Sequence, residues 1–161
     1  MHTTPGRILW SLALAALFGH APLLAQGRPL VPTGIQDLGF GALIPGIATH
    51  VLRTDPVGSG QFTLRGTKDA QVQMQFTLPP SMSGPLGATI PLSFGATDGG
   101  FSAAESITNQ VAFDPRATSL GRLSNNGRAT IFLGGTATPG PAQRSGAYSA
   151  TLTLTVSYTG L

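Results

Sequence analysis

The sequence predicts an all-β protein, folded as an antiparallel β-sandwich of about seven or eight strands. Three observations predict this class. Two segments, 70–78 and 148–158, alternate strictly between apolar and polar residues, the pattern of a strand with one buried and one exposed face. The 22 glycines and 13 prolines divide the rest into short runs. No amphipathic helix pattern follows residue 25, so no long helix is expected.

Residues 1–25 have the pattern of a secretory signal peptide. Arg7 supplies a positive charge, and the apolar stretch Ile8–Leu24 follows it. We expect cleavage after Ala25, which makes Gln26 the first residue of the mature chain. A membrane anchor is the alternative, but the stretch is short for a bilayer and is interrupted near its end. The protein is therefore expected in the periplasm, at the cell surface or outside the cell, with no stable membrane span after cleavage.

The mature chain is expected to form one domain. Residues 26–34 contain Pro29 and Pro32, which predict an extended leader, and residues 35–161 are assigned to a single sandwich domain. The chain has no cysteine, so packing alone must hold the fold.

The first three strands are predicted at 35–44, 47–54 and 61–65. The first ends at Pro45-Gly46, and the loop 55–60 separates the second from the third. Segment 70–78 is the clearest strand of the first half. It places four apolar side chains on one face, namely Val72, Met74, Phe76 and Leu78.

In the second half, strands are expected at 88–94, 110–113, 128–133 and 148–158. Pro91 within the first of these suggests an edge strand or a bulge. Asn126-Gly127 predicts a two-residue type I′ hairpin turn before 128–133. The last segment places its apolar residues at every even position: Tyr148, Ala150, Leu152, Leu154, Val156 and Tyr158.

Composition argues against several function classes. The formal net charge is +3, and the basic residues are scattered without a run or stripe, so nucleic-acid binding is not expected. His50 is the one histidine of the mature chain, so a metal site of histidines and a Ser-His-Asp triad both lack support. Asp55, Asp98 and Asp114 each precede Gly or Pro, which is typical of turns. We therefore expect no enzyme, no metal and no cofactor.

Three segments near the C-terminus carry a family resemblance. They are 131–136 (IFLGGT), 143–148 (QRSGAY) and 152–158 (LTLTVSY). Together they resemble the end of a secreted bacterial domain-of-unknown-function family and of the spore coat protein U-like pilins of archaic chaperone–usher systems. The early segment 38–41 (LGFG) is similar to the Phe-Gly element of their first strand.

The resemblance implies an incomplete, immunoglobulin-like (pilin-like) sandwich. In such pilins a periplasmic chaperone, and later the N-terminal extension of a like subunit, supplies the missing strand by β-augmentation. The implied wall of that partner-strand groove is formed by Tyr148, Leu152, Leu154, Val156 and Tyr158. The chain departs from the pattern in its proline-containing leader and its lack of the family's cysteines. It could be a self-complete member, a cap or a subunit with a weak donor.

The leading hypothesis is thus an exported, non-catalytic structural or surface protein, a pilin-like subunit of a fimbrium. A stand-alone binding module for a glycan or surface partner is the alternative. A secreted hydrolase is a third hypothesis, which would have to depend on His50.

Overall fold

The computed structural model describes residues 27–160, and within them it is all-β and antiparallel. The predicted signal peptide and its cleavage site at Ala25 and Gln26 lie outside the described residues. The twelve strands of the described part are β1 Val31–Gln36, β2 Thr49–Val51, β3 Gly60–Arg65, β4 Gln71–Thr77, β5 Ser81–Ser83, β6 Thr89–Ser93, β7 Gly99–Ser102, β8 Val111–Phe113, β9 Ser119–Arg122, β10 Arg128–Leu133, β11 Gly135–Ala137 and β12 Thr153–Tyr158. One short 3₁₀ turn, η1, spans Pro85–Gly87. Across residues 27–160, no helix has the length and apolar character needed to cross a bilayer.

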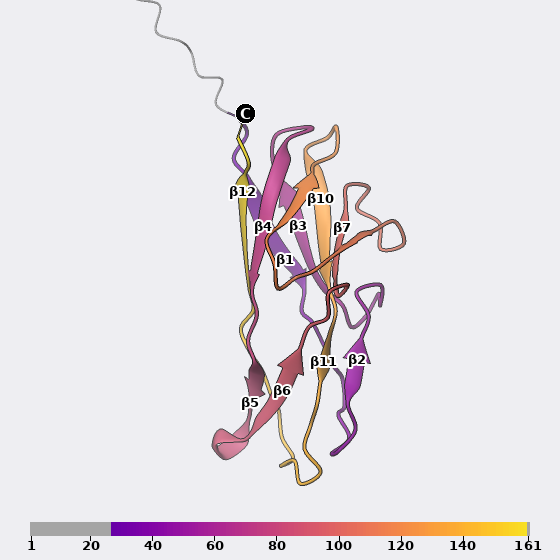
Figure 1. The fold of residues 1–161 in the computed structure, drawn as a ribbon, viewed down its shortest axis with the longest axis vertical. Helices are drawn as coiled ribbons and strands as arrows, with labels where there is room; N and C mark the ends of the chain where they lie inside the picture. The colour runs from indigo at the N-terminus through magenta and orange to yellow at the C-terminus, as the bar shows by residue number, and fades with distance from the viewer. Residues whose placement is uncertain (1–26, 161) are drawn as a thin grey trace, which may run out of the picture.

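The strands form three sheets. A five-stranded sheet has the order β1-β3-β10-β7-β8, and a three-stranded sheet has the order β12-β4-β9. The third sheet, β2-β11-β6-β5, occupies the lower half of the molecule in Figure 1. Three chain segments pass from an upper sheet to the lower sheet: β1 leads into β2 through residues 37–48, β4 leads into β5 through residues 78–80, and β10 leads into β11 through Gly134.

The main core lies between the five-stranded and the three-stranded sheets. Its buried side chains come mostly from the inward faces of β3, β4, β7 and β10; they include Leu64, Val72, Met74, Phe76, Phe101, Ala129, Ile131 and Leu133. The predicted alternation of 70–78 is confirmed, because residues 72, 74 and 76 are buried while the glutamines between them are exposed. Burial of these apolar groups is the main stabilising term in a chain without disulfides.

A second, smaller core lies in the lower half. Met82, Ile90 and Ala137 are buried there, and Phe40, Leu43, Leu92 and Tyr148 pack against them while remaining partly exposed. The lower sheet is thus covered only in part by apolar side chains.

The sequence underestimated the number of strands. The short strands β5, β7, β9 and β11 have no alternating run long enough to stand out, and β5, β7 and β11 consist largely of Gly, Ser or Thr. The sheet environment, and not the side-chain pattern, determines these elements.

The prediction of a first strand over 35–44 is wrong. The strand begins four residues earlier, at Val31, and ends at Gln36, so it includes residues of the expected leader. Pro32 is accommodated because β1 is the edge of its sheet, where one side of the strand donates no hydrogen bonds to a neighbour. The edge position expected from Pro91 is also not found, because β6 lies between β11 and β5.

The Asn126-Gly127 turn differs from the type I′ hairpin that was predicted. Gly127 has φ +70°, but Asn126 is not among the described residues with positive φ. The N–H of Gly127 donates to the Ser124 carbonyl at 2.8 Å, which gives a turn over 124–127 whose last residue is the left-handed Gly127. The turn leads from β9 in the three-stranded sheet to β10 in the five-stranded sheet, so it connects the two layers.

The terminal strand is shorter than the alternation suggested. β12 covers only Thr153–Tyr158, and Ser149 forms an isolated bridge with Ser83. Continuing the β12–β4 register places residues 150 and 151 opposite Pro80 and Pro79. Prolines have no N–H to donate, so the ladder cannot continue there.

Candidate partner-strand groove

Two strand edges lie unpaired along the same flank of the molecule. β1 is the outermost strand of the five-stranded sheet, and β12 is the outermost strand of the three-stranded sheet. Within residues 27–160 no ladder joins β1 to β12, so each strand pairs on one side only. Near the end of β12 the two edges come together, where the Tyr158 hydroxyl donates to the Arg28 carbonyl at 2.6 Å.

Further down, two adjoining hollows separate the segment that follows β1 from the segment that precedes β12. One has a volume of about 450 Å³ and the other about 570 Å³. Residues 34–45 form one wall, and residues 143–152 form the other. Both hollows are lined by Leu38, Phe40, Met82 and Tyr148, so they form one continuous groove.

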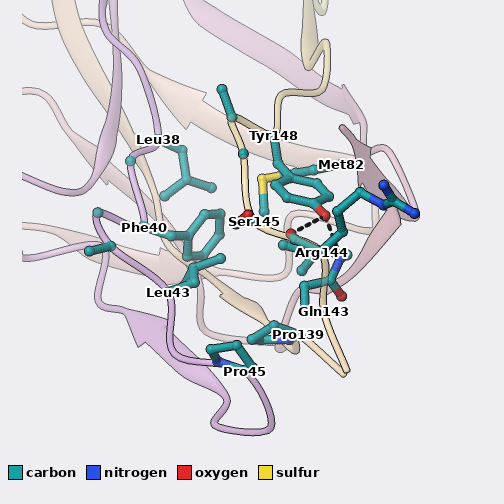
Figure 2. A pocket seen from close by; sticks show the side chains of 16 residues that line it. Leu38, Phe40, Leu43, Pro45, Met82, Pro139, Gln143, Arg144, Ser145 and Tyr148 are labelled. Atoms are coloured by element: carbon teal, nitrogen blue, oxygen red, sulfur yellow. Dashed lines mark hydrogen bonds between the residues drawn. The ribbon is translucent and has the colours of Figure 1, made fainter. Parts of the chain in front are cut away.

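The groove is lined mainly by apolar side chains. Figure 2 shows Phe40 and Leu43 on one wall, across from Tyr148 and Met82. The upper hollow is bounded by core side chains, including Phe62, Leu92, Phe94 and Leu133. The groove thus reaches the edges of both hydrophobic cores.

The Tyr148 side chain is held in a fixed position. Its hydroxyl donates to the Arg144 carbonyl at 2.7 Å and accepts from Gln143 Nε2 at 2.6 Å, as Figure 2 shows. On the other side its ring lies directly against the backbone of Gly84, so close that a Cβ there would overlap the ring. The backbone of Ser149 exchanges hydrogen bonds of 2.8 and 3.0 Å with Ser83.

Backbone groups on both walls lack backbone partners. In the described structure, residues 150–152 belong to no strand and make no backbone–backbone hydrogen bond. On the facing wall, residues 37–43 also form no strand, and Gly39 is held by a single bond to the Gly58 carbonyl at 2.9 Å. Unpaired backbone along an apolar groove is what a bound strand would satisfy.

The five residues predicted as the groove wall divide into two sets. Tyr148 and Leu152 line the hollows. Leu154, Val156 and Tyr158 are half-buried and pack against the main core. Sequence reasoning missed the facing wall and the contribution of β5, because the sequence pattern predicts a strand over 35–44 and not a groove wall, and Met82 lies in a segment without a clear strand pattern.

His50 lies outside this groove, on β2. Its Nδ1 is 2.8 Å from Thr136 Oγ1, and its Nε2 is 3.8 Å from Asp98 Oδ1. This is not the geometry of a hydrolytic triad, because the hydroxyl lies on Nδ1 instead of Nε2 and the carboxylate is too far from the ring for a hydrogen bond. Thr136 is the cross-strand partner of His50 on β11, and Asp98 Oδ2 accepts the Gly95 N–H at 2.7 Å within a turn. His50 lines neither hollow of the groove.

The turn roles predicted for the acidic residues are confirmed. Asp55 Oδ1 accepts the N–H groups of Gly58 and Val57, and these bonds lower the pKa of Asp55. Arg116 donates a bidentate pair of hydrogen bonds to the Asp114 carboxylate, which lowers the pKa of Asp114 to about 2. Among residues 27–160 no three His, Cys, Asp or Glu side chains are grouped for a metal.

No family model matches the chain, and no curated protein matches it.

Proposed function

We propose that this chain is an exported, non-catalytic structural subunit of the pilin-like kind, with an immunoglobulin-like sandwich that is one strand short. The observation that carries the proposal is the apolar groove between residues 34–45 and 143–152, the segments that adjoin the unpaired edges of β1 and β12. An extended strand from a partner would pair with exposed backbone and place alternate side chains in the groove.

The partners in this proposal are a periplasmic chaperone first and a like subunit afterwards. Such a partner contributes a strand with apolar residues at alternate positions, since these would enter the hollows lined by Phe40, Met82 and Tyr148. The unpaired edges are a liability for aggregation in a protein that stays alone, which supports a bound state during export.

The leader of this chain is already bound to its own domain. Tyr158 holds the Arg28 carbonyl, Leu30 packs against the main core, and residues 31–36 pair with β3. These residues would have to detach before they could serve as a donor strand. The arrangement therefore favours the role of strand acceptor over that of strand donor.

Binding of a defined strand tests the proposal. A synthetic peptide of alternating valine and threonine, flanked by lysines, is added to the exported chain recovered from the periplasmic fraction. We expect the peptide to bind and to raise the melting temperature, because it binds only the folded state. Leu43→Ala should weaken binding about tenfold, and Leu43→Asp should abolish it.

The matched control is Leu120→Ala, an exposed leucine of β9 on the flank away from the groove. It should bind the peptide like the wild type. If the exported chain is monomeric and stable, and neither the peptide nor a co-expressed periplasmic chaperone binds it, the strand-acceptor role is wrong.

A stand-alone binding module for a glycan or surface partner is the second candidate. The bound leader favours it, because a chain whose N-terminal residues are used internally resembles a self-contained domain. A glycan array without binding would count against the sugar version.

A secreted hydrolase has less support, although His50 lies between Thr136 and Asp98. Hydrolytic activity of the wild type that is lost in His50→Ala would revive it.

A further inference from the structure

Three arginines that are distant in the sequence lie around one hollow. Arg65 of β3 is directly opposite Arg128 of β10 and, on its other side, opposite Val31 of β1. Arg28 precedes Val31 in the leader. Together with Pro29, Asn126 and Gly127 these residues line a hollow of about 430 Å³. The cations are scattered in the sequence, and only the β1–β3–β10 register brings them together.

The positive charge in this hollow is only weakly compensated. Within residues 27–160, neither Arg28 nor Arg65 has a carboxylate within 4.0 Å, and Arg128 Nη1 is 3.8 Å from Glu105 Oε2. Like charges placed directly opposite each other on neighbouring strands destabilise a sheet. A sequence that breaks a local rule of this kind often does so at a functional site.

The backbone that carries the three arginines is fixed. The Arg28 carbonyl accepts from Tyr158, and Arg128 exchanges hydrogen bonds with Ser124: its N–H donates to Ser124 Oγ at 3.1 Å, and its carbonyl accepts from the same hydroxyl at 2.9 Å. Gly127, at φ +70°, packs so tightly on the Gly66 carbonyl that no side chain would fit. The guanidinium groups therefore extend from a rigid rim, which reduces the cost of ordering them around a ligand.

We propose that the hollow of Arg28, Arg65 and Arg128 binds one phosphate or sulfate group presented by a larger molecule at the cell surface. Guanidinium groups donate paired hydrogen bonds to such oxyanions, and three of them match a group with three or four oxygens. The hollow is open and its arginines are exposed, so a sugar ester or a lipid headgroup could enter it.

Nucleic acid is a poorer fit for this hollow. Binding an extended strand needs a continuous cationic groove with aromatic stacking surfaces. The residues that line this hollow include three arginines and no aromatic side chain. The site therefore accommodates one anionic group, and it lies near the end of β12, whereas the lower part of the partner-strand groove lies by β5 (Figure 1).

The test is a titration of the exported chain, followed by ¹H–¹⁵N correlation spectra. The probes are inorganic phosphate, glucose 6-phosphate, and vesicles of phosphatidylcholine with or without phosphatidylglycerol. We expect millimolar binding of glucose 6-phosphate or of the anionic vesicles, with shifts at the backbone of Arg65, Gly127 and Arg128. Binding by the sugar ester alone identifies a glycan source, and binding by the anionic vesicles alone identifies a lipid source.

Charge variants decide whether the hollow is responsible. Arg65→Gln and Arg128→Gln should each lower the affinity about tenfold, and Glu105→Gln should raise it by removing the competing carboxylate. Arg122→Gln removes the same charge from β9 in the other sheet and should have no effect. The proposal fails if neither glucose 6-phosphate nor the anionic vesicles bind, or if Arg122→Gln loses as much affinity as Arg65→Gln. It also fails if an oligonucleotide binds with a steep salt dependence, which would indicate contacts to many phosphates.

Discussion

Contacts at single residues set the shape of the groove, and Tyr148 is the clearest case. Its ring is held between the Gly84 backbone and the loop 143–147, with its hydroxyl bonded to Arg144 and Gln143. Tyr148 is one of the even-numbered apolar residues of segment 148–158, and it was therefore predicted to form part of the groove wall. Its hydrogen-bonded partners could not be predicted, because they come from a Gly/Pro/Ala loop without a pattern.

Gly84→Ala should displace the Tyr148 ring. A Cβ at residue 84 would overlap the ring, so we expect a loss of about 1–3 kcal/mol of unfolding free energy. Peptide binding in the groove should also weaken. Gly39→Ala is the matched control for stability only, because no atom lies within 4 Å of a Cβ built there but Gly39 itself lines the groove. Denaturant unfolding of both variants checks the prediction, and equal effects would contradict it.

The Asp114–Arg116 pair should leave a signature in the acid range. The pKa of Asp114 in the folded state is about 2, below its ordinary value of 3.8. The ion pair therefore stabilises the fold at pH values above 3.8. That contribution is lost as the pH falls through the folded pKa. Asp114→Asn should therefore show a shallower decline of stability than the wild type between about pH 4 and about pH 2. Denaturant midpoints across that range measure it, and parallel curves would refute the assignment.

At the scale of elements, the two ends of the described chain are tied together at Tyr158. The phenol at the end of β12 donates to the Arg28 carbonyl at 2.6 Å and accepts from the Thr67 N–H at 2.7 Å. Leu30 and Tyr158 also pack on the same core. The leader is thus part of the domain from residue 28 onward. The contact between Tyr158 and Arg28 also joins the β1 side to the β12 side at the end opposite the groove.

Tyr158→Phe should loosen the leader. It removes both hydrogen bonds and leaves the Thr67 N–H without its phenol partner, so we expect a loss of about 1–3 kcal/mol. Amide exchange at residues 31–36 should accelerate more than exchange in β4. Uniform acceleration over the whole domain would indicate a general loss of stability and no specific contact.

Strand prediction succeeded where one face of a strand is buried and the other is exposed. Segment 70–78 satisfies that condition and forms a strand close to the predicted bounds. Segment 128–133 also forms a strand at the predicted bounds, although β10 is buried on both faces; the preceding Asn126-Gly127 turn and the apolar run indicated it. Strand prediction failed at β1, where the segment contains Pro32 and five exposed residues in a row and so shows no alternation, although pairing with β3 makes the segment a strand. It also overextended the terminal strand, because the prolines that interrupt its ladder lie some seventy residues away in the sequence.

At the scale of the whole molecule, the class was predictable and the site only in part. Glycine and proline spacing with two alternating segments gave an all-β antiparallel protein. The terminal strand was predicted as one groove wall, but its opposite wall and the arginine hollow depend on which strands are neighbours. Long-range register determines both features, and a single sequence does not encode register in any local pattern.

The central claim is that residues 37–43 and 150–152 have unpaired backbone groups that hydrogen-bond to a partner strand. Hydrogen–deuterium exchange of the purified chain, with and without the alternating valine–threonine peptide, tests this most directly. The account predicts fast exchange of both segments in the chain alone, strong protection of both in the complex, and no change in β4. Slow exchange in the chain alone, or no protection when the peptide is bound, would contradict it.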